Sequence, residues 1–104
     1  RFKPDSDEFL ADEGPRLDRI AQALRAAGTR QFLVEGHTAD VGRPESELAL
    51  STRRAKRTVD ELVARGLSAE LFVYRGLGAT RPLVANTSEE NRARNRRVEI
   101  TILD

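Results

Sequence analysis

The only histidine of the chain, His37, lies in the segment EGHTADVG at residues 35–42, next to Thr38 and close to Asp40. A histidine in this company could act as a general base for a hydroxyl nucleophile, such as Thr38 or the more distant Ser51. It could also be a metal ligand, or it could belong to a turn that recognises a ligand. The chain has no cysteine and no second histidine, so a zinc site would require distant carboxylates to converge on His37. Because nothing in the spacing demands catalysis either, we predict neither a catalytic nor a metal site and interpret the segment as a turn.

A short apolar run, QFLVEG at residues 31–36, precedes this turn. It is bounded by glycine and has the length and composition of a buried strand. His37 and Thr38 would therefore stand at the end of the strand, in a turn framed by Gly36 and Gly42. We expect their side chains to hydrogen-bond backbone groups and so to fix the turn.

The next segment, from about Pro44 to Arg65, has helical periodicity and closes on Gly66. One face of this predicted helix is apolar, and a separate face is polar. The apolar stripe contains Leu48, Ala55, Val59 and Leu62, and the polar stripe contains Glu47, Ser51, Arg54 and Thr58.

Arg54 is the residue of the polar stripe with the most specific chemistry. If this stripe faces the loop that carries Asp40, an arginine and an acid would converge where the strand passes into the helix. Such a pair could clamp a zwitterion, since a guanidinium binds a carboxylate in a bidentate fork and an aspartate accepts hydrogen bonds from an ammonium group. A plain surface or structural salt bridge would give the same sequence pattern, so both interpretations stay open.

Two other segments could suggest nucleotide or nucleic-acid binding. GLGATRP, residues 76–82, has a Gly-x-Gly pattern but lacks the third glycine and the long helix of a dinucleotide fingerprint, so we assign its glycines to a turn. NRARNRR, residues 91–97, is basic, but no aromatic stacking partner is near, and Glu89 and Glu90 precede it. We therefore predict a solvated or internally paired face there and no nucleic-acid partner.

The remaining pattern predicts a small α/β domain. A helix is expected from Pro15 to about residue 27, strands at residues 70–76 and 96–104, and one short helix between residues 86 and 94. With an edge segment at the amino end, the order is edge segment, helix, strand, helix, strand, short helix, strand. Repeated strand-helix-strand units indicate a two-layer arrangement with the helices packed on one sheet. In the last strand, Val98, Ile100 and Ile102 alternate with Arg97, Glu99 and Thr101.

Length and charge are those of one small domain spanning residues 1–104. The formal net charge is +1, and residues 51–104 carry 11 basic and 7 acidic groups, a weaker excess than the basic footprint of a nucleic-acid domain. No apolar run approaches the ~18 residues that would span a bilayer, and no signal-peptide pattern opens the chain. The abrupt start at Arg1 indicates a domain cut from a longer protein, so any export signal or membrane anchor is expected in the part that precedes it.

Three segments carry a family resemblance when they are taken together: VEGHTADVG, LALSTRRAKRTVDELVARG and YRGLGATRPLVANTSEENRARNRRVEI. A Gly-His-Thr turn, a Leu-Ser-x-x-Arg-Ala helix and an Asn-Arg-Arg-Val-Glu strand follow one another with family-like spacing. The ordered set resembles the OmpA-like C-terminal domain, the peptidoglycan-associating module of outer-membrane proteins, the Pal lipoprotein and flagellar stator proteins. The resemblance covers about residues 2–103, and RFKPDSDEFL is similar to a truncated form of the family's first strand and loop.

The resemblance implies a two-layer β/α/β/α sandwich, with a mixed sheet and two main helices on one side. It implies non-covalent binding of peptidoglycan through the diamino acid of the stem peptide, without catalysis or cofactor, by the periplasmic part of an outer-membrane or envelope protein. In the family, the arginine corresponding to Arg54 and nearby backbone amides hold the carboxylate of that diamino acid. An aspartate directly after Gly-His-Thr meets its charged groups, and a first loop, here Pro4, Asp5 and Ser6, borders the pocket.

The chain departs from the family pattern at two positions. Ala39 stands directly after Gly-His-Thr, and the acid follows one residue later, at Asp40. A shift of one residue moves the Cα atom by about 3.8 Å and tends to turn the side chain to the other side. Glu47 replaces the asparagine commonly found three residues before Leu-Ser. Three alternatives stay open for the pocket. It binds diaminopimelate, it is adapted to ornithine or lysine, or it has lost wall binding and the domain is a scaffold that contacts other proteins. The candidate ligand-binding residues are Arg54, Asp40, Thr38, Ala39, Asp5, Glu47 and Leu50, and the structural turn residues are His37, Gly36 and Gly42.

Overall fold

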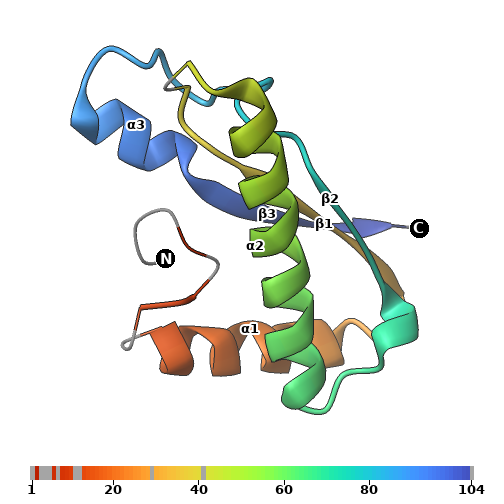
Figure 1. The fold of residues 1–104 in the computed structure, drawn as a ribbon. Helices are drawn as coiled ribbons and strands as arrows, with labels where there is room; N and C mark the ends of the chain where they lie inside the picture. Colours follow the sequence, from red (N-terminus) through yellow and green to blue (C-terminus); the bar gives the residue numbers. More distant parts are fainter. Residues whose placement is uncertain are drawn as a thin grey trace.

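The computed structural model describes residues 2, 6, 8–10, 13–28, 30–40 and 42–103, and its helices and strands follow the predicted order (Figure 1). The elements are helix α1 (Gly14–Ala26), strand β1 (Gln31–His37), helix α2 (Pro44–Ala64), the 3₁₀ turn η2 (Ala69–Leu71), strand β2 (Phe72–Gly76), helix α3 (Glu89–Asn95) and strand β3 (Arg97–Leu103).

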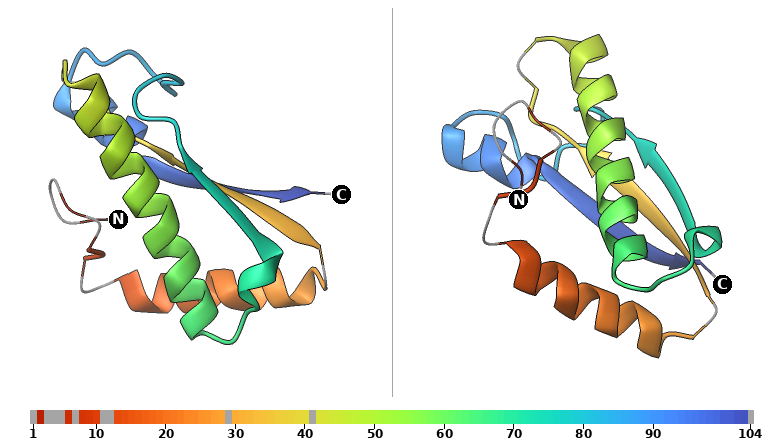
Figure 2. Two further views of the ribbon diagram at one scale, coloured as in Figure 1. Left: turned by 45° about the vertical axis from the view of Figure 1, so that its right-hand side comes forward. Right: turned by 60° about the horizontal axis from the view of Figure 1, so that its bottom comes forward.

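The sheet is mixed, with the strand order β2-β1-β3. Strand β1 runs parallel to β2, with α2 as the connection between them, and antiparallel to β3. Helices α1 and α2 lie on the same face of this sheet (Figure 2), because residues of both helices pack against Phe32 of β1. The two-layer fold class expected from the sequence is confirmed.

The two main helices begin and end at the predicted signals. Pro15 and Pro44 lie in the first turns of α1 and α2. Backbone N–H groups in a first turn make no hydrogen bond within the helix, so proline, which lacks this group, costs nothing there. Gly28 and Gly66 follow the carboxyl ends with φ values of 81° and 98°, a conformation that side chains other than glycine disfavour. No helix in the described ranges has the length and apolar content needed to span a membrane.

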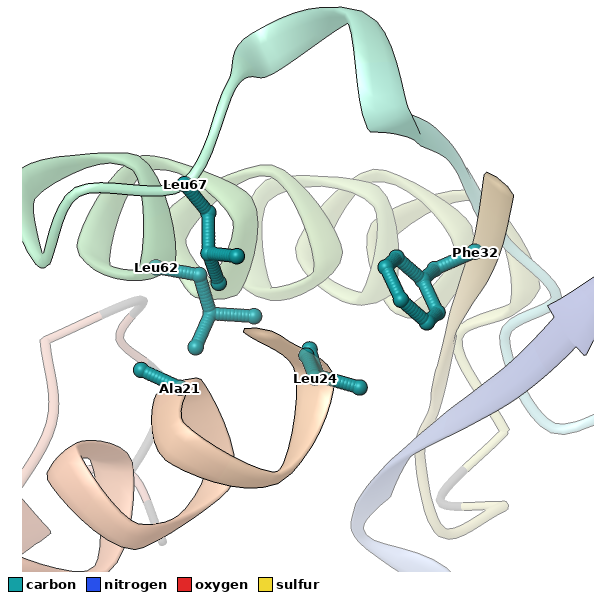
Figure 3. Close-up of a cluster of buried hydrophobic side chains, with 5 residues drawn as sticks. All are labelled: Ala21, Leu24, Phe32, Leu62 and Leu67. Carbon is teal, nitrogen blue, oxygen red and sulfur yellow. The ribbon is translucent and has the colours of Figure 1, made fainter. Parts of the chain in front are cut away.

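The core forms where α1, α2 and β1 meet (Figure 3). Ala21 and Leu24 of α1 pack against Leu62 of α2, with Phe32 of β1 and Leu67 completing the cluster. Burial of each large side chain contributes about 1.5–3 kcal/mol. The core therefore holds the carboxyl end of α2 on the sheet and leaves the amino end of that helix to be positioned by other contacts.

The apolar stripe predicted for α2 is buried except at its amino end. Ala55 and Val59 pack against Val34 of β1 in a second cluster, whereas Leu48 is 49% exposed. Leu48 lies beside Gly78, two residues past the end of β2. Leu48 belongs to the predicted apolar stripe but does not share its burial, because periodicity identifies a helix face but not the length over which the sheet covers that face.

Two strand predictions also need correction. The strand expected from Glu70 begins at Phe72, because residues 69–71 form η2. In β3, Ile100 packs into the core, but Ile102 is 45% exposed. Ile102 pairs with Phe32 near the start of β1, and β3 has β1 as its one neighbour in the described sheet. Alternation alone does not reveal that a strand lies at an edge.

Candidate ligand-binding groove

The polar stripe of α2 is buried. Glu47 is 6% exposed and Arg54 is 5% exposed, and Ser51 and Thr58 are buried with them. Burying charged side chains is unfavourable unless partners compensate for the lost hydration. The polar stripe is therefore part of the protein interior and not a solvated helix face.

Helix α2 lies directly on the backbone of the sheet at Ser51. A Cβ atom on Gly36 would overlap the Ser51 carbonyl group, and one on Gly76 would overlap the Thr52 nitrogen. Protein interiors are close-packed and cannot absorb such an overlap without moving an element. The glycine of the Gly-His-Thr turn thus sets how closely α2 approaches β1.

Hydrogen bonds connect this helix contact to the turns that follow β1 and β2. The Ser51 hydroxyl oxygen accepts from the Gly78 N–H group at 2.9 Å. The Gly78 carbonyl oxygen accepts from the Thr38 N–H group at 2.9 Å, and Leu77 N–H donates to the Gly36 carbonyl oxygen at 2.9 Å. The two turns are held to each other and to α2 mainly by backbone atoms.

A groove of about 1010 Å³ opens beside this junction, between α1, α2, α3 and β3. These four elements surround the same region of the molecule in the views of Figures 1 and 2. Five of the predicted binding residues line the groove: Thr38 and Ala39 from the turn after β1, and Glu47, Leu50 and Arg54 from α2. The structure thus brings these five residues together around a space the size of a small-ligand site.

Arg54 is held in the groove by the amino-terminal segment. Its Nε donates to the Ser6 carbonyl oxygen at 2.8 Å, and its Cζ atom lies 5.0 Å from the centre of the Phe2 ring. Phe2 and Phe9 form an antiparallel bridge and stack with ring centroids 4.3 Å apart. Ser6 thus contacts Arg54, a residue of the groove, whereas Pro4 and Asp5 of the predicted first loop lie outside the described residues.

His37 ends β1 and is buried. Among the described residues, neither ring nitrogen has a hydrogen-bond partner, and a Glu99 carboxylate oxygen lies 3.7 Å from Nε2. Burial and then the charge of Arg97 lower the pKa of His37 below its usual 6.5, so the ring is neutral at pH 7. The described ranges contain no group of three His, Cys, Asp or Glu side chains suited to a metal ion. The prediction that the His37 side chain hydrogen-bonds the turn is wrong, because backbone bonds hold the turn instead.

Thr38 carries a second polar group without a partner. The residue is 5% exposed, and its Oγ1 atom makes no hydrogen bond within the described part of the chain. The expected side-chain bond from Thr38 to the backbone is therefore also wrong. Because buried hydroxyl groups are nearly always hydrogen-bonded and Thr38 lines the groove, this oxygen is a candidate ligand contact.

Asp40 does not line the groove that contains Arg54. Its Oδ1 atom accepts from the Gly42 N–H group at 2.9 Å, and its own N–H group donates to Asn86 Oδ1 at 3.2 Å. Gly42 has a φ of 79°, so the turn is a tight one that the Asp40 carboxylate closes. Asp40 lines a separate hollow of about 370 Å³, and Glu47 lines both spaces.

Asn95 is a structural residue that the sequence did not single out. It is fully buried, and its Oδ1 atom accepts from Leu83 N–H at 2.8 Å and Val84 N–H at 3.1 Å. Its Nδ2 atom donates to the Val84 carbonyl oxygen at 2.9 Å and to Asn86 Oδ1 at 2.8 Å. Through Asn86 this network reaches the backbone of Asp40. The only sequence signal for it is the asparagine of the Asn-Arg-Arg motif.

Three of the four arginines in the basic run at residues 91–97 form ion pairs within the chain. Arg92 and Arg96 contact Glu89, and Arg97 contacts Glu99. The hydrogen bond from Arg96 lowers the pKa of Glu89. The face was predicted to be solvated or internally paired, and three of its arginines are paired while Arg94 is exposed. The paired arginines brace α3 and the start of β3.

The fold and the groove define a small α/β binding domain, and comparison with known proteins identifies its family. The family model of the OmpA family matches residues 1–96, so the chain belongs to that family. Peptidoglycan-binding protein ArfA of Mycobacterium tuberculosis is 38% identical over 101 residues, which are 97% of this chain and 31% of ArfA. The chain therefore corresponds to about a third of the length of that relative.

Two solved structures extend the comparison to three dimensions. The C-terminal domain of Helicobacter pylori MotB matches with a TM-score of 0.90 and 30% identity, covering 99% of this chain and 81% of that one. The cell wall anchor of the T6SS from Pseudomonas aeruginosa matches with a TM-score of 0.85 and 38% identity, covering 97% of this chain and 73% of that one. The family resemblance inferred from the sequence is confirmed.

Proposed function

We propose that this domain binds peptidoglycan non-covalently in the periplasm and anchors a larger envelope protein to the cell wall. In this proposal it acts as a binding module without catalysis, and its groove takes the diamino acid of a stem peptide, diaminopimelate, ornithine or lysine. The observation that carries the proposal is the buried guanidinium group of Arg54 in a groove that also contains Thr38 and Ala39.

The local chemistry of Arg54 supports a carboxylate ligand. Nε donates to the Ser6 carbonyl oxygen, and the planar guanidinium group has the donor geometry that matches a carboxylate. The Phe2 ring lies over the guanidinium group and restricts its orientation. A positioned arginine recognises a planar anion with less loss of side-chain entropy than a mobile one.

The relatives support the same ligand class. One is described as peptidoglycan-binding and another as a cell wall anchor, and both share about two fifths of their aligned residues with this chain. The five predicted binding residues that line the groove lie within residues 1–96, the part of the chain that the OmpA family matches.

Sedimentation with purified cell-wall sacculi tests the proposal. Arg54→Ala should weaken binding about 10- to 100-fold, the range expected when a hydrogen-bonded charged contact is lost. Arg53→Ala is the matched control, because Arg53 is the exposed neighbour on the same helix, and its loss should change binding less than about threefold. Circular dichroism of each variant checks that the fold is retained. Equal losses from both variants, or binding that salt abolishes and free diamino acid does not compete, would point to nonspecific charge attraction.

The alternative function is an OmpA-like scaffold that has lost wall binding and contacts other proteins. Its supporting observation is the position of Asp40, which closes its own turn and lines the smaller hollow. Sacculi separate the two functions directly. Wild-type protein that stays in the supernatant at all concentrations favours the scaffold.

A further inference from the structure

Two contacts that orient the Arg54 side chain come from the amino-terminal segment. Its Nε atom donates to the Ser6 carbonyl oxygen at 2.8 Å, and its Cζ atom lies 5.0 Å from the centre of the Phe2 ring. Arg54 itself lies in the middle of α2, far from both partners in the sequence. The direction of this guanidinium group is therefore set in part by a segment outside the helix.

The Phe2 ring is held in turn by Phe9. The two rings stack with centroids 4.3 Å apart and an angle of 24° between their planes, and the two residues form an isolated antiparallel bridge. Between them, the Ser6 hydroxyl oxygen accepts from the Glu8 N–H group at 2.9 Å, a local bond typical of a turn. Phe2 and Phe9, here termed the aromatic pair, are thus fixed as one unit, and Phe9 is connected to Arg54 through the Phe2 ring.

The aromatic pair lines the groove. Both rings lie along it together with Arg54, and both residues are half-buried. An arginine side chain has considerable rotational freedom, which is lost when a ligand fixes it. A ring packed over one face of the planar guanidinium group removes part of this freedom before the ligand arrives. Loss of the aromatic pair should therefore weaken binding through the orientation of Arg54.

We propose that Phe2 and Phe9 are positioning residues for peptidoglycan binding. The aromatic pair holds Arg54 in the orientation in which it meets the wall ligand, so docking of the pair and binding of the ligand stabilise each other. This inference rests on the proposed function and extends it to two residues that act through Arg54. Because such coupling is reciprocal, the ligand must tighten the aromatic pair by the same factor by which the docked pair tightens the ligand.

Sedimentation with sacculi tests the positioning role. Phe2→Leu and Phe9→Leu keep an apolar side chain but lose the ring, and each should weaken binding about 3- to 10-fold. Phe2→Tyr and Phe9→Tyr keep the ring and should bind within about twofold of wild type. Tyr74→Leu is the matched control, because Tyr74 is a half-exposed aromatic residue of β2 outside the groove. Thermal unfolding of each variant checks that the fold is retained.

A fluorescent probe measures docking of the aromatic pair without any ligand. The chain has no tryptophan, so Phe9→Trp introduces a single one and keeps an aromatic ring in the stack. Adding Arg54→Ala removes the guanidinium contact and should raise the acrylamide quenching constant about twofold or more. Adding Arg53→Ala should leave quenching unchanged, because Arg53 is the exposed neighbour on the same helix.

The same probe tests the reciprocal coupling. Saturating soluble muropeptides, released from the sacculi used for sedimentation, should lower the quenching constant of the Phe9→Trp protein. They should have no such effect after Arg54→Ala is added, since the coupling passes through that side chain.

The outcomes separate the two proposals. Quenching that Arg54→Ala does not change would overturn the positioning role and leave wall binding intact. Leucine variants that bind sacculi as well as wild type would do the same, as would equal losses from the leucine and tyrosine variants. If a leucine variant does not fold, the quenching comparison still decides. Wild-type protein that does not bind sacculi would overturn the proposed function and the positioning role with it.

Discussion

The two hollows that share Glu47 use their polar groups in different ways. In the groove, Arg54 is buried and the Thr38 hydroxyl has no partner among the described residues. In the smaller hollow, the Asp40 carboxylate accepts from Gly42 and closes a turn. An acid that completes the chain's own turn is part of the framework, whereas an unsatisfied buried oxygen that lines a groove is a candidate ligand contact. Proximity to the Gly-His-Thr motif in sequence therefore does not decide which acid faces the groove.

The largest loss of stability is expected when the close contact between α2 and β1, which positions both hollows, is disturbed. Gly36→Ala places a Cβ atom into the backbone of Ser51, so α2 must shift relative to β1. Urea unfolding should show a loss of about 3 kcal/mol or more in the free energy of unfolding. Gly14→Ala is the control, because nothing lies within 4 Å of its Cβ position and alanine favours helix. Equal stability of the two variants would show that the Gly36 contact does not position α2.

The second-largest loss of stability is expected from the Asn95 hydrogen-bond network, which reaches Asp40 of the smaller hollow through Asn86. Asn95→Ala leaves the N–H groups of Leu83 and Val84 without their acceptor and should lower the free energy of unfolding by about 2–3 kcal/mol. Asn91→Ala on the same helix loses one exposed side-chain bond to Thr87 and should cost less than about 1 kcal/mol. Urea unfolding measures both, and similar losses would contradict the central role of the Asn95 network.

A smaller effect tests whether Asp40 is a structural residue. Asp40→Ala removes the acceptor for Gly42 N–H and should cost about 0.5–1.5 kcal/mol of stability. Asp40→Asn keeps an oxygen at the same place and should retain at least half of that contribution. Thermal unfolding compares the variants. If Asp40→Asn destabilises the protein as much as Asp40→Ala, the negative charge of Asp40 stabilises the turn and the oxygen atom alone does not.

The smallest effect is a pH dependence at the turn between the two hollows. The pKa of His37 is lowered in the folded protein, first by burial, from its usual 6.5. The unfolded state therefore binds more protons in the interval below pH 6.5, and the free energy of unfolding should fall as the pH drops through that interval. Below the folded-state pKa, His37 should add no further loss. Unfolding curves of His37→Gln between pH 7 and pH 5 should lack this component, and an unchanged pH slope would contradict the assignment.

The order of elements could be predicted because it depends on local periodicity. The bounds of α2 follow from Pro44, the apolar repeat and Gly66, all of which act within a few residues. The exposure of Leu48 and Ile102 could not be predicted in this way. It depends on where the sheet ends, which is a property of the assembled fold and not of any segment.

The sequence predicted most of the residues that share the groove, but it did not predict the direction of Asp40. The family resemblance identified Arg54, Thr38 and Glu47, and the structure places all three in one groove. The direction of Asp40 depends on the turn at Gly42 and on a hydrogen bond with Asn86, 46 residues away. Such a long-range contact leaves no periodic signal in one sequence. The contacts of Arg54 with Ser6 and Phe2 have the same long-range character.

The backbone contact between α2 and the sheet has a mechanical consequence. At Gly36 and Gly76 no side-chain layer separates the helix from the strands, so there is little compressible material between them. A load applied to α2 along its axis would act on these close backbone contacts and on the Ser51 bond to Gly78. Because the contact is made by backbone atoms, changes of side-chain rotamer do not allow the helix to slide over the sheet at this point. Under tension, we therefore expect α2 and the sheet to move together until these contacts break.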